Sequence, residues 1–198
     1  MKKRLVLFDF DGTITTDDTL LKFIHFYHGS FRFLTGFTIL SPILALHLLK
    51  LIPNWRAKEI VLAWFFKGRD IKTFNQKCLE FADLIDTTMV RAMAMKKIRQ
   101  LVNDQSTVVI VSASAENWVR PWCEKHSLHC IATRLEVING RLTGKIAGKN
   151  CYGPEKESRI RAQFDILEYP EIIAYGDSRG DREMLALASK KHYKPFRD

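Results

Sequence analysis

The sequence predicts an α/β fold: a doubly wound, mainly parallel sheet with a helical cap inserted after the first strand. Three apolar runs, residues 4–10, 107–114 and 171–178, each end in small or acidic residues. Such runs are typical of strands that are buried on both faces of a parallel sheet. Helical patterns follow the second and third runs, and strands that alternate with helices indicate this fold class. About ninety residues separate the first two runs, far more than one crossover helix requires.

The long segment after the first strand predicts the cap. Its pattern is helical from residue 16 to about residue 86, and a further helix over about 88–103 returns the chain to the sheet. The turn signals within the cap are His28 with Gly29, Pro53 with Asn54, and Gly68. We therefore divide the chain into a core, residues 1–15 and 87–198, and a helical cap, residues 16–86.

The remaining elements complete the alternation of strands and helices. ENWVRPWCEKH predicts a helix after the second strand, followed by a short strand and a hairpin that turns at Asn139 and Gly140. A helix begins near Pro154, and RGDREMLALA predicts the last helix. Because ligands of such sheets bind beyond the carboxyl ends of the strands, the polar residues after the three strands are expected to meet in one crevice.

Composition limits the class of protein. The chain has 198 residues, of which 46% are hydrophobic, and a net charge of +9, which favours anionic partners such as phosphorylated substrates or acidic lipid headgroups. No run of five like charges forms a basic arm, and we expect no nucleic-acid partner. The four cysteines and six histidines lack metal-ligand spacing, so the cysteines are expected to be reduced thiols of a cytosolic protein. Two aspartates interrupt the apolar N-terminal run, which therefore predicts a strand rather than a signal peptide.

The first strand ends in two aspartates, in the sequence LFDFDGTIT. Asp9 and Asp11 alternate along an extended backbone, and a turn that begins at Gly12 can bring both towards one phosphate. Gly12 also lets the backbone approach a ligand and offers an N–H to phosphate oxygens. Transfer of a phosphoryl group to a carboxylate needs a nucleophile, an acid, a divalent cation and groups that bind the phosphoryl oxygens.

The other predicted elements supply the remaining groups. Ser112, at the end of the second strand, can donate a hydroxyl hydrogen bond. Lys156, in the first turn of a predicted helix, adds its charge to the positive end of the helix dipole. Asp177 and Asp181, in GDSRGD, offer the oxygen ligands that a hard cation prefers.

The ordered set DFDGT, VVIVS, GPEK and GDSRGD resembles the four motifs of the haloacid dehalogenase superfamily, in its phosphoserine-phosphatase-like branch (subfamily IB). The helical cap between the first two motifs fits that branch, and the resemblance extends over essentially the whole chain. It implies a phosphatase rather than an ion pump or a dehalogenase, because Asp11 has little use where a halide leaves without a proton.

The resemblance also implies a role for each position. Asp9 would be the nucleophile that becomes an aspartyl phosphate, and Asp11 would protonate the leaving oxygen and then activate water. Mg²⁺ would be held by the Asp9 carboxylate, the Asp11 backbone carbonyl and Asp177. The groups that would bind the phosphoryl oxygens are Gly12, Ser112 and Lys156. Asp181 would orient Lys156 or the waters of the metal.

Several positions have a second interpretation. Lys149 is an alternative to Lys156, although the helix-start context favours Lys156. Asp18 occupies a place where phosphoserine phosphatases carry an acidic substrate-binding residue, but it fits equally well as the N-cap of the first cap helix. Trp118 and Trp122, four residues apart on a predicted helix, indicate core packing. The cations interpreted as solvated cap surface are Arg56, Lys58 and Arg69.

The cap contains an unusually apolar segment. Residues 33–49 carry no formal charge and lie between Arg32 and Lys50. Seventeen residues is the lower limit for spanning a bilayer. The segment therefore predicts either a buried helix pair, broken at Ser41 and Pro42, or a helix that lies on a membrane surface. This cap character resembles that of the phosphatidylglycerophosphatase C group of the same branch.

Together these features predict a Mg²⁺-dependent phosphomonoester hydrolase that acts through an aspartyl phosphate, on a lipid phosphate such as phosphatidylglycerophosphate. The alternatives are a soluble phosphatase of small metabolites resembling phosphoserine, and a non-catalytic module that binds phosphorylated ligands. The expected location is the cytoplasm, peripheral on the inner face of the membrane. The sequence does not indicate an oligomeric state.

Overall fold

The computed structural model describes residues 3–197. It contains a five-stranded parallel sheet in the order β3-β2-β1-β6-β7, which confirms the predicted fold class. The strands of this sheet are β1 (Arg4–Phe8), β2 (Thr107–Ala115), β3 (His129–Thr133), β6 (Glu171–Gly176) and β7 (Lys190–Tyr193). The strand order reverses at β1, which pairs with β2 on one side and β6 on the other. Such a reversal opens a crevice at the carboxyl ends of the central strands.

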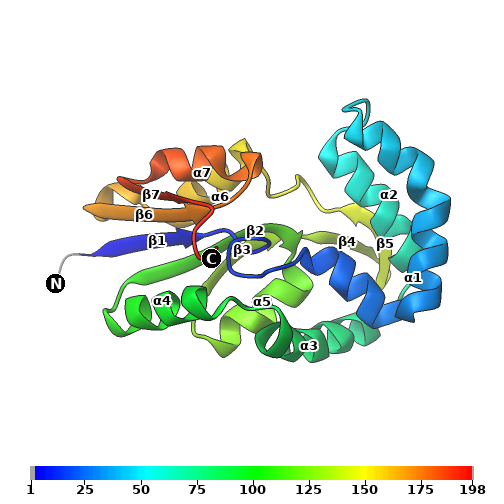
Figure 1. Ribbon diagram of the computed structural model, residues 1–198, viewed down its shortest axis with the longest axis horizontal. Coiled ribbons are helices and arrows are strands. Elements are labelled where there is room, and N and C mark those ends of the chain that lie inside the picture. Colours follow the sequence, from blue (N-terminus) through cyan, green and yellow to red (C-terminus); the bar gives the residue numbers. More distant parts are fainter. Residues whose placement is uncertain (1–2, 198) are drawn as a thin grey trace.

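Helices lie on both faces of this sheet and beyond its end. They are α1 (Thr19–Leu48), α2 (Asn54–Phe66), α3 (Ile71–Thr88), α4 (Ala92–Asn103), α5 (Glu116–Lys125), α6 (Pro154–Gln163) and α7 (Arg182–Leu187). Figure 1 shows α4 and α5 on one face and α6 and α7 on the other. Two short 3₁₀ helices, Ile166–Glu168 and Arg179–Asp181, flank β6.

Alternate residues of the central strand reach two separate cores. Val6 and Phe8 belong to the core beneath α4 and α5, whereas Leu5 and Leu7 belong to the core beneath α6 and α7. Period-two alternation of side chains explains why the run reads as continuously apolar. Trp118 and Trp122, whose side chains were predicted to pack in the core, are 1% and 0% exposed.

Two predicted boundaries differ from those of the structure. The first strand ends at Phe8 instead of residue 10, although the Asp9 N–H still donates to the Tyr175 carbonyl at 2.9 Å. The helix predicted from about residue 88 begins at Ala92, because residues 89–91 hydrogen-bond to residues 14–16.

The predicted break at Ser41 and Pro42 is wrong. One helix, α1, runs through both residues, and its irregular position is Gly29, with φ 75° and ψ 171°. Pro42 has no N–H to donate to the Thr38 carbonyl, but the Ser41 hydroxyl donates to that oxygen at 2.7 Å. The lost helical hydrogen bond is therefore replaced, and the helix continues. The predicted turn signal at Gly29 coincides with the observed kink.

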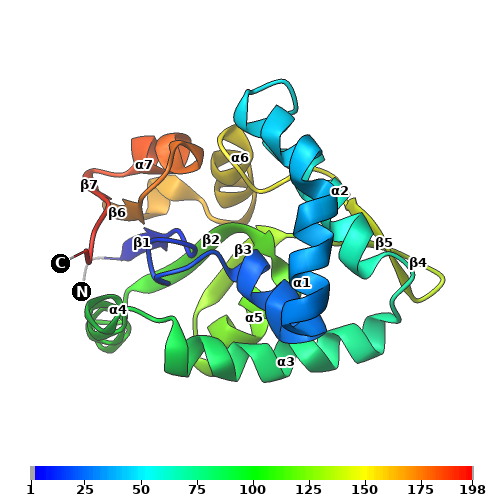
Figure 2. The ribbon, with the colours of Figure 1, turned by 45° about the vertical axis from the view of Figure 1, so that its right-hand side comes forward.

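The hairpin of β4 (Leu135–Ile138) and β5 (Arg141–Ile146) turns at Asn139 and Gly140 as predicted, and both turn residues have positive φ. It does not pair with the main sheet. Instead the Gly68 N–H donates to the Leu142 carbonyl at 2.7 Å, and the Leu142 N–H donates to the Arg69 carbonyl at 2.9 Å. The hairpin therefore lies against α2 and the link that follows it, as Figure 2 shows.

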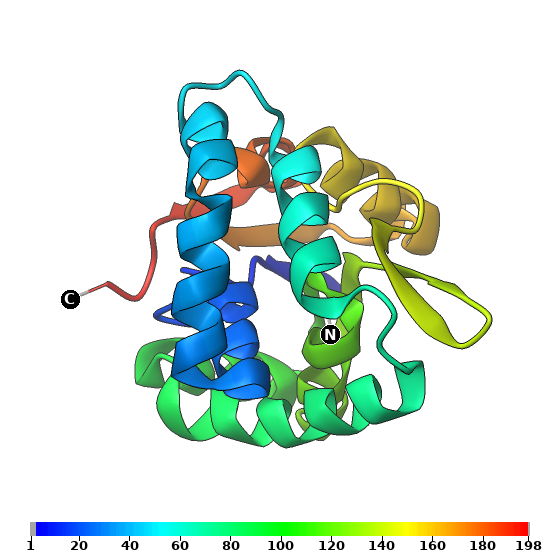
Figure 3. The same cartoon turned by 90° about the vertical axis from the view of Figure 1, so that its right-hand side faces the viewer.

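The first three helices occupy the segment predicted as the cap. α1 and α2 stand side by side beyond the end of the sheet (Figure 3), while α3 runs along α5. At the crossing of α1 and α2, a Cβ on Gly36 would lie 2.4 Å from the Phe65 ring. The exact division at residues 15/16 and 86/87 stays a prediction.

Candidate active site

The polar residues predicted to meet at the carboxyl ends of the strands do meet there. Asp9 and Asp11 follow β1, and Asp177 follows β6. They line a pocket of about 340 Å³, together with Gly12, Lys156 and Asp181. Residues from the start of α1 and from α2 close its other side. The pocket thus lies where the strand order reverses.

Lys156 is the centre of the buried charge network. Its ammonium group donates to the Asp9 carboxylate at 2.6 Å, the Asp181 carboxylate at 2.6 Å and the Val111 carbonyl at 2.7 Å. These three contacts use all three of its N–H groups. Lys149, the alternative, has an exposed side chain and does not line this pocket. The geometry therefore favours Lys156 as the cation of the crevice.

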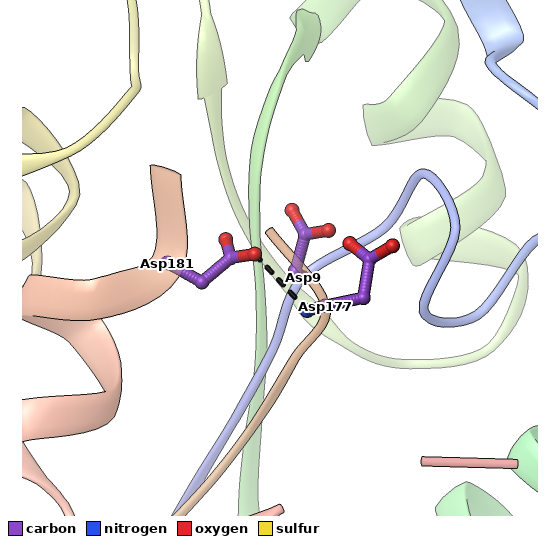
Figure 4. Close-up of side chains that lie close together, drawn as sticks. All are labelled: Asp9, Asp177 and Asp181. Atoms are coloured by element: carbon purple, nitrogen blue, oxygen red, sulfur yellow. Dashed lines mark hydrogen bonds between the residues drawn. The ribbon is translucent and has the colours of Figure 1, made fainter. Parts of the chain in front are cut away.

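Three carboxylates of the crevice lie close to one another, and two of them, Asp9 and Asp181, contact Lys156. Asp9, Asp177 and Asp181 each place an oxygen within 4.8 Å of the others (Figure 4). One Asp181 oxygen accepts from Lys156, and the other accepts from the Asp177 and Ser178 N–H groups at 3.1 and 2.9 Å. Both oxygens of Asp181 are thus engaged by its neighbours, and its orienting role stays a prediction.

The crevice carries an excess of negative charge. Burial raises the pKa of Asp9 to about 7, against the opposing attraction of Lys156 and with added repulsion from Asp181 and Asp11. Although burial opposes a charged ammonium, Asp9 and Asp181 raise the pKa of Lys156. Burial and repulsion from Asp181 also raise the pKa of Asp177. A set of oxygen donors with too little positive charge fits a hard divalent cation such as Mg²⁺.

Gly12 allows the turn after β1 to lie against Asp177. Its φ is +76°, and a Cβ there would lie 2.5 Å from an Asp177 carboxylate oxygen. A side chain would therefore displace one of the converging carboxylates. Arg197 also reaches this point, donating to the Asp177 carboxylate at 2.5 Å and to the Gly12 carbonyl at 3.5 Å.

Asp11 is held by a chain of hydrogen bonds that the sequence analysis missed. Its carboxylate accepts from the Thr19 N–H at 2.7 Å and from the Ser114 hydroxyl at 2.6 Å. The Thr19 hydroxyl donates to Ser114 at 3.1 Å and accepts from the Trp118 indole at 3.1 Å. The polar alternation in VVIVSAS was the available signal for Ser114, because residues two apart on a strand point the same way.

Ser112 lies behind the pocket wall. Its side chain is completely buried, its hydroxyl accepts from the Ser114 N–H at 2.9 Å, and it lies 3.4 Å from the Asp11 carboxylate. Ala113 and Ser114, but not Ser112, line the pocket. A phosphate-binding role for Ser112 stays a prediction.

The interpretation of Lys58 as solvated surface is wrong. Its ammonium group donates to the Ala113 carbonyl at 2.9 Å and to the Asn150 side-chain oxygen at 3.4 Å, and it lines the pocket. Burial lowers its pKa, against the attraction of Asp11 and Asp18. The placement depends on how α2 packs over the end of β2, which periodicity in α2 does not encode. Arg56 and Arg69 are exposed, as expected.

Asp18 combines both of its predicted features. Its carboxylate accepts from the Leu21 N–H at 3.1 Å and so caps α1, and it also lines the pocket. Burial, with added repulsion from Asp11, raises its pKa. The N-cap interpretation is confirmed, while contact with a substrate stays a prediction.

Residues 6–186 match the model of the haloacid dehalogenase-like hydrolase family. Protein CicA of Caulobacter vibrioides is 32% identical over 198 residues, which cover 98% of this chain and 86% of that protein. A probable phosphatase of Mycobacterium tuberculosis is 41% identical over 81 residues, which cover 39% of this chain and 28% of that protein.

Solved structures share the fold at lower identity. A protein with unknown function from Bordetella pertussis Tohama I superposes with a TM-score of 0.84 at 19% identity, over 96% of this chain and 89% of that one. A phospho-aspartyl intermediate analogue of phosphoserine phosphatase superposes with a TM-score of 0.69 at 21% identity, over 96% of this chain and 86% of that one.

Proposed function

Because this chain belongs to the haloacid dehalogenase-like hydrolases, we propose that it is a phosphatase of the phosphoserine-phosphatase-like branch, which hydrolyses phosphomonoesters with Mg²⁺ through a phosphorylated Asp9. The observation that carries this proposal is the position of Lys156, which lies 2.6 Å from both Asp9 and Asp181 in a crevice where Asp177 also converges. A buried nucleophile beside a fixed cation is suited to a phosphoryl group.

In the proposed reaction, an Asp9 carboxylate oxygen attacks phosphorus and the bond from phosphorus to the leaving oxygen breaks. Asp11 gives its proton to that oxygen, so the leaving group departs as an alcohol. Asp11 then takes a proton from the water that hydrolyses the acyl phosphate, which restores Asp9 and releases phosphate. Lys156 holds Asp9 in place and attracts the phosphoryl oxygens through its positive charge, while Asp181 holds Lys156.

Mg²⁺ would be held by the Asp9 carboxylate, the Asp11 backbone carbonyl and Asp177. When bound, it supplies positive charge to the phosphoryl oxygens and to the carboxylates that raise one another's pKa. Asp181 is a poorer ligand, because Lys156 and two backbone N–H groups already engage both of its oxygens.

The test is turnover of an aryl phosphate by wild type and by Asp9→Asn, with Mg²⁺ or with EDTA. We expect EDTA and Asp9→Asn each to abolish turnover. When wild type is quenched during turnover, we expect its intact mass to be higher by one phosphoryl group. Asp104→Asn, an exposed aspartate at the end of α4, is the matched control and should behave as wild type. Near-normal activity of Asp9→Asn would overturn the mechanism. Ligand binding with no turnover by wild type would favour the non-catalytic alternative.

For the substrate we propose a lipid phosphate, because the cap exposes much apolar surface. The apolar outer surface of the cap comprises Phe31, Leu34, Ile39, Leu46, Leu48, Leu49 and Leu51. Phe31 and Leu48 are 80% and 81% exposed. Residues 19–58 contain five lysines and arginines and no acidic residue. An apolar surface with cations beside it suits an anionic membrane surface.

We propose that this helix lies on the membrane instead of crossing it. α1 is long and apolar enough to span a bilayer, by length and composition alone. Its first turns, however, are fixed in the protein: Phe23 and Ile24 are completely buried, and the Phe23 ring stacks on Trp118. The remaining length after the kink at Gly29 leaves the outer surface free to contact lipid. The protein would then be peripheral on the cytoplasmic face of the membrane.

The alternative is a small polar phosphate such as phosphoserine. Asp18 and Lys58 favour it, because both line the catalytic pocket and offer opposite charges to an amino acid. A substrate panel with phosphoserine and phosphatidylglycerophosphate, run beside co-sedimentation with phosphatidylglycerol vesicles, separates the two. Efficient turnover of phosphoserine without vesicle binding would overturn the lipid proposal and leave the phosphatase mechanism intact.

A further inference from the structure

A second and larger cavity opens beside the catalytic pocket. Its volume is about 760 Å³, against about 340 Å³ for the catalytic pocket. It lies between the start of α2, the loop that follows β5 and the start of α6. Asn54 and Tyr152 line both cavities, so the two share a wall. We call this second cavity the side cleft.

The lining of the side cleft differs in character from that of the catalytic pocket. Five of its residues have apolar or aromatic side chains: Pro53, Trp55, Ile146, Tyr152 and Pro154. The lining of the catalytic pocket instead contains six aspartates and two lysines. The charged pocket suits a phosphate, but it offers little to an apolar leaving group, whereas the side cleft does.

Two aromatic side chains form the accessible wall of the cleft. Trp55 is 48% exposed and Tyr152 is 40% exposed. Tyr152 is backed by Gly180, where a Cβ would lie 2.3 Å from the Tyr152 ring. The ring is therefore held next to the turn that carries Asp181, at the border of the two cavities. Large aromatic faces that stay accessible in this way suit contact with an apolar ligand.

The charges at the cleft favour an anionic over a cationic ligand. Glu59 lies 3.6 Å from Arg56, and Glu155 lies 2.8 Å from Arg159, so both acidic residues have cationic partners. Lys149 lines the cleft and makes no ion pair within the described residues 3–197. The uncompensated charge of the cleft wall is therefore positive.

The cleft wall follows the apolar outer surface of the cap closely in sequence. That surface ends at Leu48, Leu49 and Leu51, only a few residues before Pro53 and Trp55 of the cleft wall.

We propose that the side cleft binds the apolar part of the leaving group of an amphiphilic phosphomonoester, while its phosphate lies against Asp9. This inference rests on the proposed phosphatase function and names the class of substrate for the same site. Trp55 and Tyr152 contact the chain, and Lys149 lies at the rim near any second anionic group of the substrate.

The test is a series of n-alkyl phosphates from ethyl to decyl, kept below their micelle-forming concentrations, with KM measured for each. Each buried methylene contributes up to about 0.8 kcal/mol, or about fourfold. We expect KM to fall by at least about 100-fold from ethyl to decyl phosphate, since part of the chain stays in water. Trp55→Ala should cut that ratio to about tenfold or less, because it removes one wall.

Trp64→Ala is the matched control. Trp64 lies on the same helix and is 51% exposed, but it does not line the cleft. Its variant should keep the wild-type dependence on chain length. Ser158→Trp, at an exposed position of α6 in the cleft wall, fills the cleft without removing core packing and should flatten the same dependence. Calorimetric binding of ethyl- and decylphosphonate gives the same comparison without turnover.

The outcomes separate this inference from the function on which it rests. A KM that does not depend on chain length in wild type, or a dependence that survives both Trp55→Ala and Ser158→Trp, would overturn the side cleft and leave the phosphatase mechanism standing. Failure to hydrolyse any ester of the series, with decylphosphonate still bound more tightly than ethylphosphonate, would overturn the mechanism but not the cleft.

Discussion

Charged side chains are usually exposed and apolar ones buried, and the catalytic crevice and the apolar outer surface of the cap depart from this rule in opposite directions. In the crevice, Asp9, Lys156 and Asp181 are buried charges, whereas on the outer surface Phe31 and Leu48 are exposed apolar side chains. In the crevice each of these buried charges has an opposite charge at 2.6 Å, and the charge that remains in excess is negative. The outer surface, by contrast, leaves Phe31 and Leu48 80% and 81% exposed. The first region therefore indicates chemistry performed by the protein, and the second suits the contact with a membrane that we propose.

The largest expected effect comes from removing the cation of the crevice. Lys156→Met leaves Asp9 and Asp181 buried without their partner, which typically costs about 3–5 kcal/mol. We expect a loss of that size in the free energy of unfolding, measured by urea denaturation, and loss of nearly all turnover. The control is Lys145→Met, whose exposed side chain lies outside both the catalytic pocket and the side cleft. It should change stability by no more than about 0.5 kcal/mol. Equal effects of the two variants would show that Lys156 does not hold the buried carboxylates of the crevice.

The second prediction concerns pH. The folded-state pKa of Asp9 is raised to about 7 from 3.8, so the folded protein retains a proton that the unfolded chain has lost. In EDTA, the contribution of Asp9 to stability should therefore be complete below about pH 4 and fall as pH rises to about 7.

The measurement is the free energy of unfolding across that pH window, for wild type and Asp9→Asn. The variant should lose this part of the slope, because an amide does not titrate there. Added Mg²⁺ should oppose the decline in wild type, since it favours the ionised carboxylate. An identical slope in both proteins would show that Asp9 is not the titrating group.

The third prediction tests the other side of the comparison. Leu48→Gln combined with Leu49→Gln should weaken binding to phosphatidylglycerol vesicles by about tenfold or more, because two exposed leucines lose their contact with lipid. Stability should change by less than about 0.5 kcal/mol per residue, since neither side chain is buried. Co-sedimentation and thermal unfolding measure the two quantities. Leu167→Gln, an exposed leucine remote in sequence from the cap, should leave vesicle binding unchanged.

The sequence was most informative where function depends on short local units. Asp9, Asp11 and Asp177 follow buried strands, and parallel strands bring their carboxyl ends together whatever lies between them. Lys156 was also predictable, because it lies in the first turn of a helix that begins with proline.

The features of the site that the sequence did not reveal depend on contacts between residues far apart in the chain. Lys58 enters the crevice only because α2 lies over the end of β2, and Thr19 meets Ser114 across 95 positions of sequence. The predicted break at Pro42 failed for a local reason: the neighbouring hydroxyl of Ser41 replaces the missing donor. A proline signal alone does not reveal such compensation.

The attachment of the hairpin to the link after α2 has a mechanical consequence. A cap inserted at one point of a chain is joined to the core by two segments of backbone and can rotate about them as a hinge. Here both the N–H and the carbonyl of Leu142 are hydrogen-bonded to the link after α2, so a rotation of α2 must also move the hairpin. The two ends of the hairpin therefore act as further connections between the cap and the core. We therefore expect the cap to rock by a small amplitude rather than to open widely.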